Sequence, residues 1–350
     1  MKQDDTSRQT IGMDLGDRYA HVCVLDDEGE VVEECRVAQT ARGLRGYLGG
    51  REPAVIAIEA STHSPWVSRM TTELGHEVLV ANPRRTRAIW DRHDKNDRTD
   101  AEMLARLARF EPKLLYPIQH RGAEAQLVRS ALRAREALVR VRTTLINTVR
   151  SLVKGVGSRL PKKTSASFHT LRDQLPGEVG PVLLPLMDEL ESLTTRIRGY
   201  DRTLREAAQE LFSEVERLEQ VDGVGPITAL AFVSTLEEPT RFARSRKVPA
   251  YLGLTPRQDQ SGGLTKQCRI SKRGDELVRR LLVQCAQYIL GPFGKDCALR
   301  RWGLRLAERG GKAGKRRATV AVARKLAVLL HRLWLTGDDY EPMRGVSVPA

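Results

Sequence analysis

The sequence predicts an α/β domain at the N-terminus, followed by a long helical region and a mostly α-helical C-terminal part. Three observations lead to this prediction. Short β-like runs precede alternating strands and helices in the first third of the chain, heptad patterns fill the middle, and helical, strongly basic segments make up the end. A chain of 350 residues is long enough for two or three such domains.

The N-terminal third begins with three short runs of β-forming residues. They cover Thr10 to Leu15, Ala20 to Leu25 and Val31 to Val37, and Asp26 to Gly29 reads as the hairpin turn between the last two. Runs of this kind, joined by short turns, predict an antiparallel meander.

Alternating helix and strand patterns follow the meander. The run Ala54 to Ala60, AVIAIEA, is continuously apolar, as expected for a buried central strand. With the meander, these segments predict an α/β domain of about 110 residues. The other predicted elements are helices at Thr40 to Leu48, Ser64 to Leu74, from about Arg84 and from about Asp97, and a strand at Glu77 to Val80.

Four carboxylates stand at the ends of these predicted elements. Asp14 lies near the end of the first strand, and Glu59 lies at the end of AVIAIEA. Asp97 and Asp100 are three residues apart at the start of the last helix, so they share one helix face. The alternative interpretation of this last pair is a solvated helix start, where the macrodipole favours acids and the flanking basic residues neutralise them.

Acids at the ends of buried strands need partners, and a divalent cation is the usual one. Carboxylate oxygens suit Mg²⁺ or Mn²⁺ better than zinc. Pairs of such ions, ~3.5–4 Å apart, clamp the attacking and leaving oxygens in phosphoryl transfer. A meander with Asp on the first strand, Glu on the fourth and acids on a late helix resembles the RuvC-like, ribonuclease-H-type fold. We therefore expect a metal site at Asp14, Glu59, Asp97 and Asp100.

Charge and composition point to a nucleic-acid partner. The net charge is +14 with a pI near 9.9, and a protein this basic is expected to meet a polyanion. No apolar run reaches the ~18 residues of a membrane span. Five cysteines without a C-x-x-C pair, and a polar first segment, MKQDDTSRQT, favour a reducing cytoplasm over secretion.

The central region carries two heptad seams, separated by a Gly-, Pro- and Ser-rich break from Gly155 to Gly180. They predict an antiparallel helical hairpin, a coiled coil between protomers, or both, and a plain helical bundle is the alternative. The first seam comprises Leu127, Ala131, Ala134, Leu138, Val141, Leu145, Thr148 and Leu152. The second comprises Leu186, Leu190, Leu193, Ile197, Tyr200, Leu204, Ala207, Leu211 and Leu218.

An arginine-rich face is predicted to lie exposed beside the first seam. It could be an ordinary solvated surface, but it also suits a track of phosphates. Its members are Arg129, Arg133, Arg135, Arg140, Arg142 and Arg150.

Two segments of the C-terminal part are candidates for contact with nucleic acid. In VDGVGP, Gly223 and Gly225 precede a helix that begins near Ile227, and glycines at such a place let backbone N–H groups approach a phosphate. The spacing resembles the hairpin of helix-hairpin-helix modules, which grip DNA backbone without reading its sequence. Further along, the segment RISKRG supplies Arg269, Lys272 and Arg273.

Ser261 stands in a Ser-Gly-Gly sequence before a short predicted strand, Leu264 to Ile270. Ordinary loop chemistry is one interpretation. The other is a nucleophile that glycines expose to a bulky substrate. No histidine lies nearby in the sequence to serve as a base, which argues against a hydrolase triad. If Ser261 is a nucleophile, metal bound to its target phosphate is the obvious source of activation, and Asp259 is an untested neighbour.

Together these motifs resemble the IS one-hundred-and-ten insertion-sequence transposase family, also called bridge-RNA-guided DNA recombinases. The resemblance runs from Ile11 to about Leu335, and the two halves occur in the right order. The matching segments are IGMDLG at Ile11 to Gly16, AIEAS at Ala57 to Ser61, KNDRTDAEMLARL at Lys95 to Leu107, VDGVGPITA at Val221 to Ala229, YLGLTP at Tyr251 to Pro256, QSGG around Ser261 and RISKRGDELVRRLLVQCA ending at Ala286.

The resemblance implies a RuvC-like domain at 1–112 with a D-E-D-D set, here Asp14, Glu59, Asp97 and Asp100. It implies a helical dimerisation region at 120–218 and a transposase domain with a catalytic serine, here Ser261, at 219–335. The polar sequence after these domains predicts a flexible tail at 336–350. The serine is expected to form a phosphoserine with DNA held by the metal-binding acids. A structured RNA would choose donor and target, and dimers would meet in a tetramer.

Asn96 departs from the threonine that is usual at this place in the family, without changing the acids. Two other functions stay open at this point. One is a metal-dependent, structure-specific nuclease, such as a junction resolvase, that uses only the four acids. The other is a non-catalytic nucleic-acid scaffold, in which the acids merely satisfy helix and strand ends.

Overall fold

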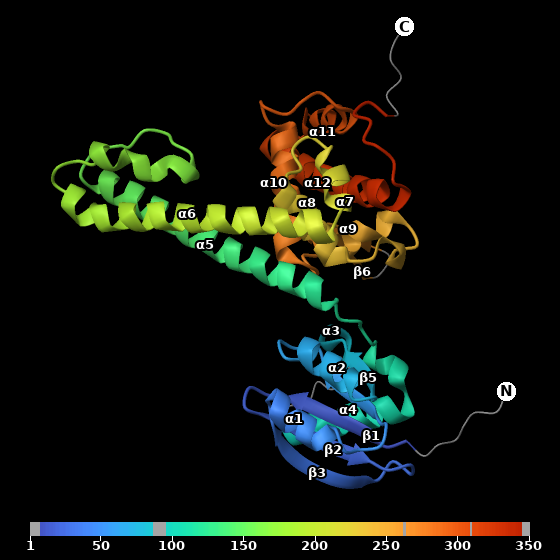
Figure 1. Ribbon diagram of the computed structural model, residues 1–350. Coiled ribbons are helices and arrows are strands. Elements are labelled where there is room, and N and C mark those ends of the chain that lie inside the picture. Colours follow the sequence, from blue (N-terminus) through green and yellow to red (C-terminus); the bar gives the residue numbers. More distant parts are fainter. Residues whose placement is uncertain (1–7, 87–95, 262–263, 309, 345–350) are drawn as a thin grey trace. The chain divides into compact units, whose positions relative to one another are not determined.

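A computed structural model of the chain describes residues 8–86, 96–261, 264–308 and 310–344, and the side chains of 258–268 and 312 lie outside the description. The chain divides into two compact units, residues 1–121 and 122–350 (Figure 1). None of the described helices is long and apolar enough to cross a membrane.

The first unit contains a mixed five-stranded sheet in the order β3-β2-β1-β4-β5. Strands β1, β2 and β3 form the expected antiparallel meander, whereas β1, β4 and β5 run parallel. The strands are β1 (Thr10–Leu15), β2 (Tyr19–Leu25), β3 (Val31–Ala38), β4 (Val55–Glu59) and β5 (Glu77–Ala81). The order and directions are consistent with the ribonuclease-H-type fold that the sequence predicts.

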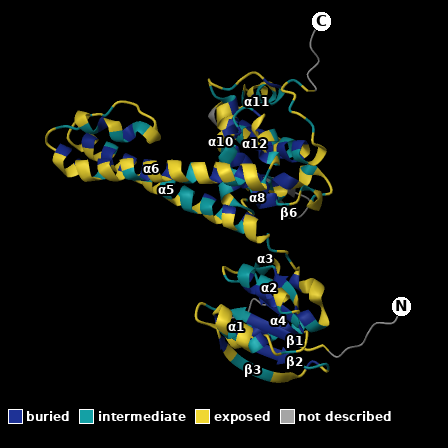
Figure 2. Cartoon of the chain, in the orientation of Figure 1, coloured by how far each residue is buried: buried dark blue, intermediate teal, exposed yellow. Residues whose placement is uncertain are grey.

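Helices cover this sheet because the side chains of β1 alternate between its two faces. Ile11 and Met13 pack into one cluster with residues of α1 and α2, while Ala101 and Ala105 of α4 lie over β1 on the other face. Figure 2 shows the central strand β1 mostly in the dark blue of buried residues, whereas the edge strand β3 is mostly exposed or half-buried. The helices are α1 (Ala41–Leu48), α2 (Ser64–Glu73), α3 (Pro83–Thr86), α4 (Asp97–Phe110) and the 3₁₀ helix η1 (Pro112–Leu115).

The second unit begins with two long helices, α5 (Ala123–Gly155) and α6 (Gly180–Leu211), which pack side by side (Figure 1). Val128 clusters with Leu204, whereas Val149 clusters with Leu183, so the helices run antiparallel. The predicted hairpin is therefore present within one chain. The 3₁₀ helix η2 (Ser165–Gln174) covers its far end.

The packed face of α5 lies one residue later than the predicted seam. Leu127 and Val141, which the prediction buries, are exposed, 73% and 48% respectively. The actual contact face contains Val128, Leu132, Arg135, Val139, Arg142, Ile146, Val149 and Val153, of which Arg135, Val139 and Arg142 are half-buried. In α6 the predicted Leu190, Leu193, Ile197 and Leu204 are buried, but Leu211 is exposed.

Arginines in the middle of the hairpin explain this difference. Arg135 pairs with Asp201, and Arg142 donates to Thr194 Oγ1 over 3.3 Å. A pattern of apolar residues cannot reveal a contact face that contains charged groups, so it selected the neighbouring stripe. Arg135 and Arg142 are therefore part of the helix–helix contact, and the prediction that they lie on an exposed face was wrong.

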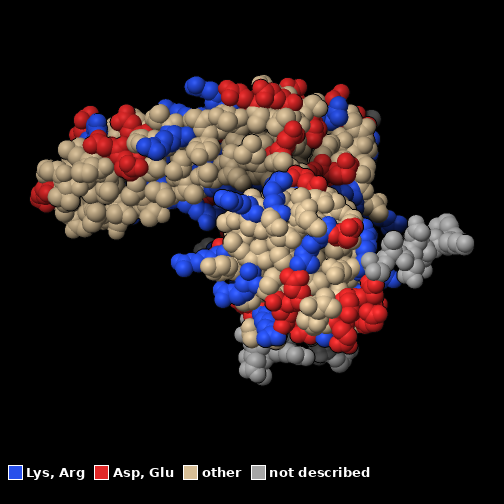
Figure 3. All heavy atoms as spheres, turned by 60° about the horizontal axis from the view of Figure 1, so that its bottom comes forward, with Lys and Arg blue, Asp and Glu red and all other residues tan. Residues whose placement is uncertain are grey.

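The rest of the second unit includes α8 (Pro226–Leu236), which is buried from Thr228 to Leu236 within the main apolar cluster of this unit. The helical, basic C-terminus that the sequence predicts is present as α11 and α12. The other elements are α7 (Glu214–Glu219), η3 (Pro239–Arg241), η4 (Ser245–Lys247), α9 (Val248–Tyr251), β6 (Pro256–Ser261), β7 (Leu264–Ile270), α10 (Glu276–Leu290), α11 (Ala298–Glu308) and α12 (Gly311–Thr336). Figure 3 shows Lys and Arg alternating with clusters of Asp and Glu, not one continuous basic surface, on the face in view.

Candidate active site

A close contact between β1 and α4 places three of the four predicted acids. A Cβ atom on Gly12 would lie 2.0 Å from the carbonyl oxygen of Ala101 and 2.5 Å from the backbone nitrogen of Ala105. Only glycine leaves room for the α4 backbone at this distance. The contact fixes the first turn of α4, with Asp97 and Asp100, beside the end of β1, where Asp14 lies.

The start of α4 is fixed by Asn96. Its side chain accepts a hydrogen bond from the backbone nitrogen of Arg98 over 3.2 Å, and Thr99 Oγ1 donates to its carbonyl oxygen over 2.7 Å. This is an N-cap, for which asparagine is among the best residues. Arg98 pairs with Glu34 of β3 and so does not neutralise the acids locally, while Lys95 lies outside the described residues.

Asp14 and Glu59 lie at the carboxyl ends of neighbouring parallel strands, because β1 and β4 pair with Met13 opposite Ile58. The pKa of Asp14 is raised to about 6, first because the carboxyl group is partly desolvated. The negative charges of Asp97, Asp100 and Glu59 raise it further. The structure thus brings all four predicted acids into one electrostatically coupled group.

His21 joins this group and was not among the predicted residues. It lies opposite Asp14 in the β1–β2 register, and its Nε2 atom is 3.7 Å from Asp97 Oδ2. Its charge opposes the rise in the pKa of Asp14. The tight turn between the first two strands fixes this register, so counting residues back from the turn could have identified His21.

The donor set fits a divalent cation, although the carboxylates are not in ligand positions. Among the residues that the structure describes, no three His, Cys, Asp or Glu side chains converge closely enough to hold a metal ion. A cation between these acids would nevertheless be bound by hard oxygen donors, and it would relieve the mutual repulsion of the carboxylates. Asp14, whose carboxyl group is partly desolvated, would gain most.

Ser261 lies in the other unit, at the end of strand β6 and not in a loop. Its backbone pairs with Leu264 across the β6–β7 hairpin. Gly262, Gly263 and the side chains of Ser261 and Asp259 lie outside the described residues. The acids belong to the first unit and the serine to the second, so the predicted set is divided between them.

Two interlocked glycines hold the base of this hairpin. Gly253 has φ +72° and Gly274 has φ +131°, and a Cβ on Gly274 would lie 2.1 Å from the carbonyl oxygen of Tyr251. Lys272 N donates to Gly253 O over 3.1 Å. The segments YLGLTP and RISKRG therefore pack against each other at the base of the hairpin. Arg269, Lys272 and Arg273 are all exposed there, as candidates for phosphate contact must be.

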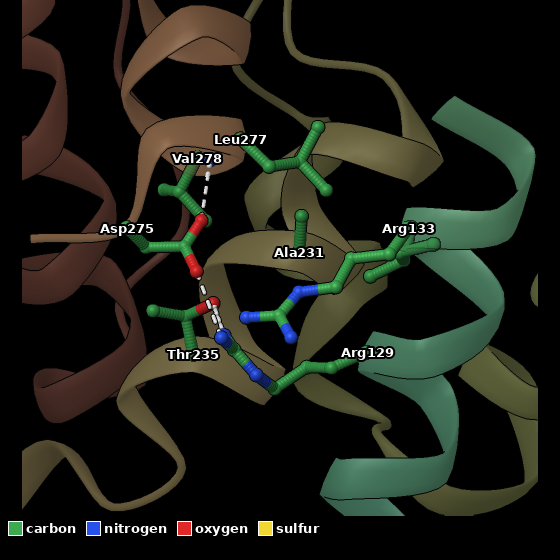
Figure 4. Close-up of a pocket in the computed structure, with 8 residues that line it drawn as sticks. Arg129, Arg133, Ala231, Thr235, Asp275, Leu277 and Val278 are labelled. Atoms are coloured by element: carbon green, nitrogen blue, oxygen red, sulfur yellow. Dashed lines mark hydrogen bonds and ion pairs between the residues drawn. The ribbon is translucent and has the colours of Figure 1, made fainter. Parts of the chain in front are cut away.

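A buried ion pair joins Asp275, which directly follows RISKRG, to α5 and α8 (Figure 4). Asp275 caps α10 by accepting from Val278 N over 3.0 Å, and Arg129 Nη2 donates to its other oxygen over 2.8 Å. Arg129 also donates to Thr235 at the end of α8. The side chain of Arg129 is only 13% exposed, so its predicted place on a solvated face was wrong.

The segment VDGVGP joins α7 to α8 in a tight turn. Gly223 has φ +89° and packs against Tyr288, while Gly225 is exposed and caps α8. A Cβ on Gly225 would meet nothing within 4 Å, so the space before the helix is open. Binding of a phosphate there stays a prediction.

Comparison with known protein families matches two transposase domains to the chain, in the order that the sequence predicts. Residues 11–157, which include all four acids, match a DEDD transposase domain of the IS110 type. Residues 215–295, which include Gly223, Gly225 and Ser261, match the domain described as "Transposase IS116/IS110/IS902 family".

Relatives match over most of their length. A probable family 20 transposase of Pseudomonas aeruginosa is 32% identical over 95% of this chain and 98% of its own. The transposase for insertion sequence element IS1111A of Coxiella burnetii is 27% identical over 94% and 90%, and that for IS1328 of Yersinia enterocolitica is 29% identical over 79% and 82%. The chain therefore belongs to the IS116/IS110/IS902 family of insertion-sequence transposases, enzymes that act on DNA.

Proposed function

We propose that this transposase exchanges DNA strands through a phosphoserine on Ser261, at a site whose four acids bind divalent cations. The observation that carries the proposal is the clustering of Asp97, Asp100 and Glu59 around the partly buried Asp14. A group of mutually repelling carboxylates is unfavourable unless it has a cationic ligand. Mg²⁺ or Mn²⁺, when bound, would polarise the scissile phosphate and stabilise charge on its oxygens.

In this scheme Ser261 Oγ attacks the phosphorus atom. A Ser–O–P bond forms while the bond from phosphorus to a deoxyribose oxygen breaks, and the proton of the serine ends on the leaving hydroxyl. One phosphoester replaces another, so the step conserves bond energy and needs no nucleoside triphosphate. A second DNA hydroxyl then attacks the phosphoserine and restores Ser261.

The acids and the serine belong to separate units, an arrangement that is compatible with a composite site whose halves come from different protomers. We propose dimers that meet in a tetramer, with RuvC-like and serine domains of different protomers facing one phosphate. Donor and target would be chosen by a structured RNA of the element. Pairing by RNA leaves the protein to bind backbone and shape, which suits a chain with 58 Lys and Arg but only 5% aromatic residues.

The test uses a plasmid pair that carries donor and target sites, with the RNA-encoding flank of the element. The wild-type protein should yield recombinants and a covalent DNA–protein adduct after denaturation. Ser261→Ala should abolish both, and Asp97→Asn should reduce both. Retention of strand cleavage by Ser261→Ala would refute the phosphoserine, and wild-type recombination without the flank would refute RNA guidance. The relatives are named transposases, so a resolvase that uses only the acids is not proposed.

A further inference from the structure

The second unit contains a hollow of about 890 Å³, bounded by α11, α12 and the segment that follows α12. We propose that this hollow binds an unpaired stretch of nucleic acid, with phosphates on its arginines and a base on its apolar floor. The inference rests on the proposed function, since it gives a transposase that uses RNA and opened DNA a place for an unpaired strand. It concerns none of the residues discussed above as nucleic-acid contacts.

The hollow is lined by one face of each helix. Arg324, Val328 and Arg332 follow one another at intervals of four along α12, so they share a face. Trp302 and Arg305 stand on the facing side of α11. Arg324 and Arg332 are separated by about two helix turns, roughly 12 Å, which lets them contact different phosphates.

Most of the basic side chains that line this hollow are not neutralised by a carboxylate. Among the described residues, five basic side chains of the hollow take part in no ion pair, whereas a sixth, Arg344, pairs with Asp338. Of the lining residues that the structure describes, only Asp339 and Glu341 carry negative charge. Concentrated, unpaired positive charge of this kind attracts an anionic chain. The five are Arg246, Arg305, Arg324, Lys325 and Arg332.

The floor of the hollow is apolar and contains an aromatic ring. Leu306, Val328 and Leu329 line it together with Trp302, whose ring is only partly buried. Lys325 Nζ lies 4.2 Å from the centroid of the Trp302 ring. An incoming base can replace this ammonium on the ring, while the flexible lysine moves to the adjoining phosphate.

This combination favours an unpaired strand over a duplex. The backbone of a duplex presents mainly phosphates and sugars to a protein groove, and these polar groups gain nothing from contact with an apolar floor. Unpaired strands present bases that stack on aromatic side chains between phosphates held by basic ones. RNA and DNA share this chemistry, so the test must separate them.

The test measures equilibrium binding of labelled oligonucleotides to the full-length protein in buffer without divalent metal. Three ligands of one sequence are compared: unpaired RNA, unpaired DNA and duplex DNA. The charge variant is Arg324→Gln/Arg332→Gln, and the matched control is Arg198→Gln/Arg202→Gln on the exposed face of α6. Trp302→Leu tests stacking, and Trp302→Phe should restore part of it.

The charge variant should bind the unpaired ligands about ten-fold more weakly, with a log–log salt slope reduced by about 1.4, or ~0.7 for each lost phosphate contact. Trp302→Leu should weaken binding without changing the slope. The stronger of the unpaired ligands identifies the strand. Equal loss for the duplex, or unchanged binding by the charge variant, would overturn the inference and leave an acidic protein partner as the occupant. Failure of the wild type to bind any of the three would instead refute the proposed function.

Discussion

Gly12 of β1 and Ala101 of α4 are in such close contact that any β-carbon on Gly12 would overlap the Ala101 carbonyl oxygen, at 2.0 Å. The obstacle is backbone, which cannot move aside as a flexible side chain can. The position of α4, and with it the position of Asp97 and Asp100 beside Asp14, therefore depends on the absence of a side chain at residue 12.

The first prediction concerns this contact. Gly12→Ala should push α4 from the sheet, lower the free energy of unfolding by about 1–3 kcal/mol and abolish recombination, because the acids separate. Thermal unfolding and plasmid recombination measure the two effects. Gly46→Ala in α1 is the control, since a Cβ there meets nothing within 4 Å. Equal activity of both variants would contradict the role of the contact.

The second prediction concerns the charge of Asp14. Because its pKa rises from 3.8 to about 6 on folding, ionisation costs stability. The cost is absent below pH 4, develops between pH 4 and 6 and is complete above that. Without metal, Asp14→Asn should therefore be more stable than the wild type at pH 7, by about 1–2 kcal/mol after allowance for solvent screening.

The same pair of proteins tests the proposed cation. Added Mg²⁺ or Mn²⁺ should raise the melting temperature of the wild type and change that of Asp14→Asn much less, because the variant lacks one ligand charge. Chemical denaturation at pH 4 and pH 7, with and without metal, gives both comparisons. If the wild type instead gained stability relative to the variant from pH 4 to pH 7, this result would contradict a raised pKa of Asp14 in the folded protein.

The third prediction concerns the Asp275–Arg129 pair. Burial would raise the pKa of Asp275, but the hydrogen bond from Val278 and the charge of Arg129 lower it overall. The carboxylate therefore contributes stability above its unfolded pKa, near 4, and this contribution is lost as the pH falls through the folded pKa. Acidification should destabilise the wild type more than Asp275→Asn.

At pH 7, Asp275→Asn should cost about 3 kcal/mol, because Arg129 is left buried without its partner. Glu276→Gln is the matched control, since that neighbouring side chain is 73% exposed and its loss should change little. Urea denaturation at pH 3.5 and 7 separates the variants. Similar stability of both at pH 7 would show that the buried pair does not fix α10.

The fourth prediction concerns the hairpin of α5 and α6. Arg142 has a buried Nε atom that finds no hydrogen-bond partner among the described residues, and burial lowers the pKa of this guanidinium. Replacing it with methionine should stabilise the protein by about 1 kcal/mol, because the unsatisfied group is removed. The exposed Arg140, replaced in the same way, should give no gain in thermal unfolding. A loss of stability in Arg142→Met would mean that the Thr194 hydrogen bond outweighs the unsatisfied atom.

Much of the first unit could be predicted from the sequence because its signals are local. Strand alternation, the Asp26 to Gly29 turn and the apolar run before Glu59 each determine a short element, and the meander places those elements in order. The grouping of Asp14 with Glu59 then follows from parallel pairing of two strands. The role of Gly12 does not follow, because it depends on how closely a distant helix approaches.

The helix contacts of the second unit are harder to predict from the sequence because these helices bury charged side chains. The apolar pattern of α5 selected Leu127 and Val141, whereas the contact face uses Arg135 and Arg142 and passes by those residues. Asp275 likewise gives no local sign of its partner, Arg129, which precedes it by 146 residues. Pairings between distant residues are decided by tertiary packing, which periodicity within one helix does not record.

The charged middle of the α5–α6 hairpin separates two apolar clusters, and the far one, around Phe168 and Met187, is sealed by η2 and contains no residue of the main cluster. The end of the arm thus has a core of its own. Its amide hydrogens are therefore expected to exchange with solvent independently of those in the rest of the unit.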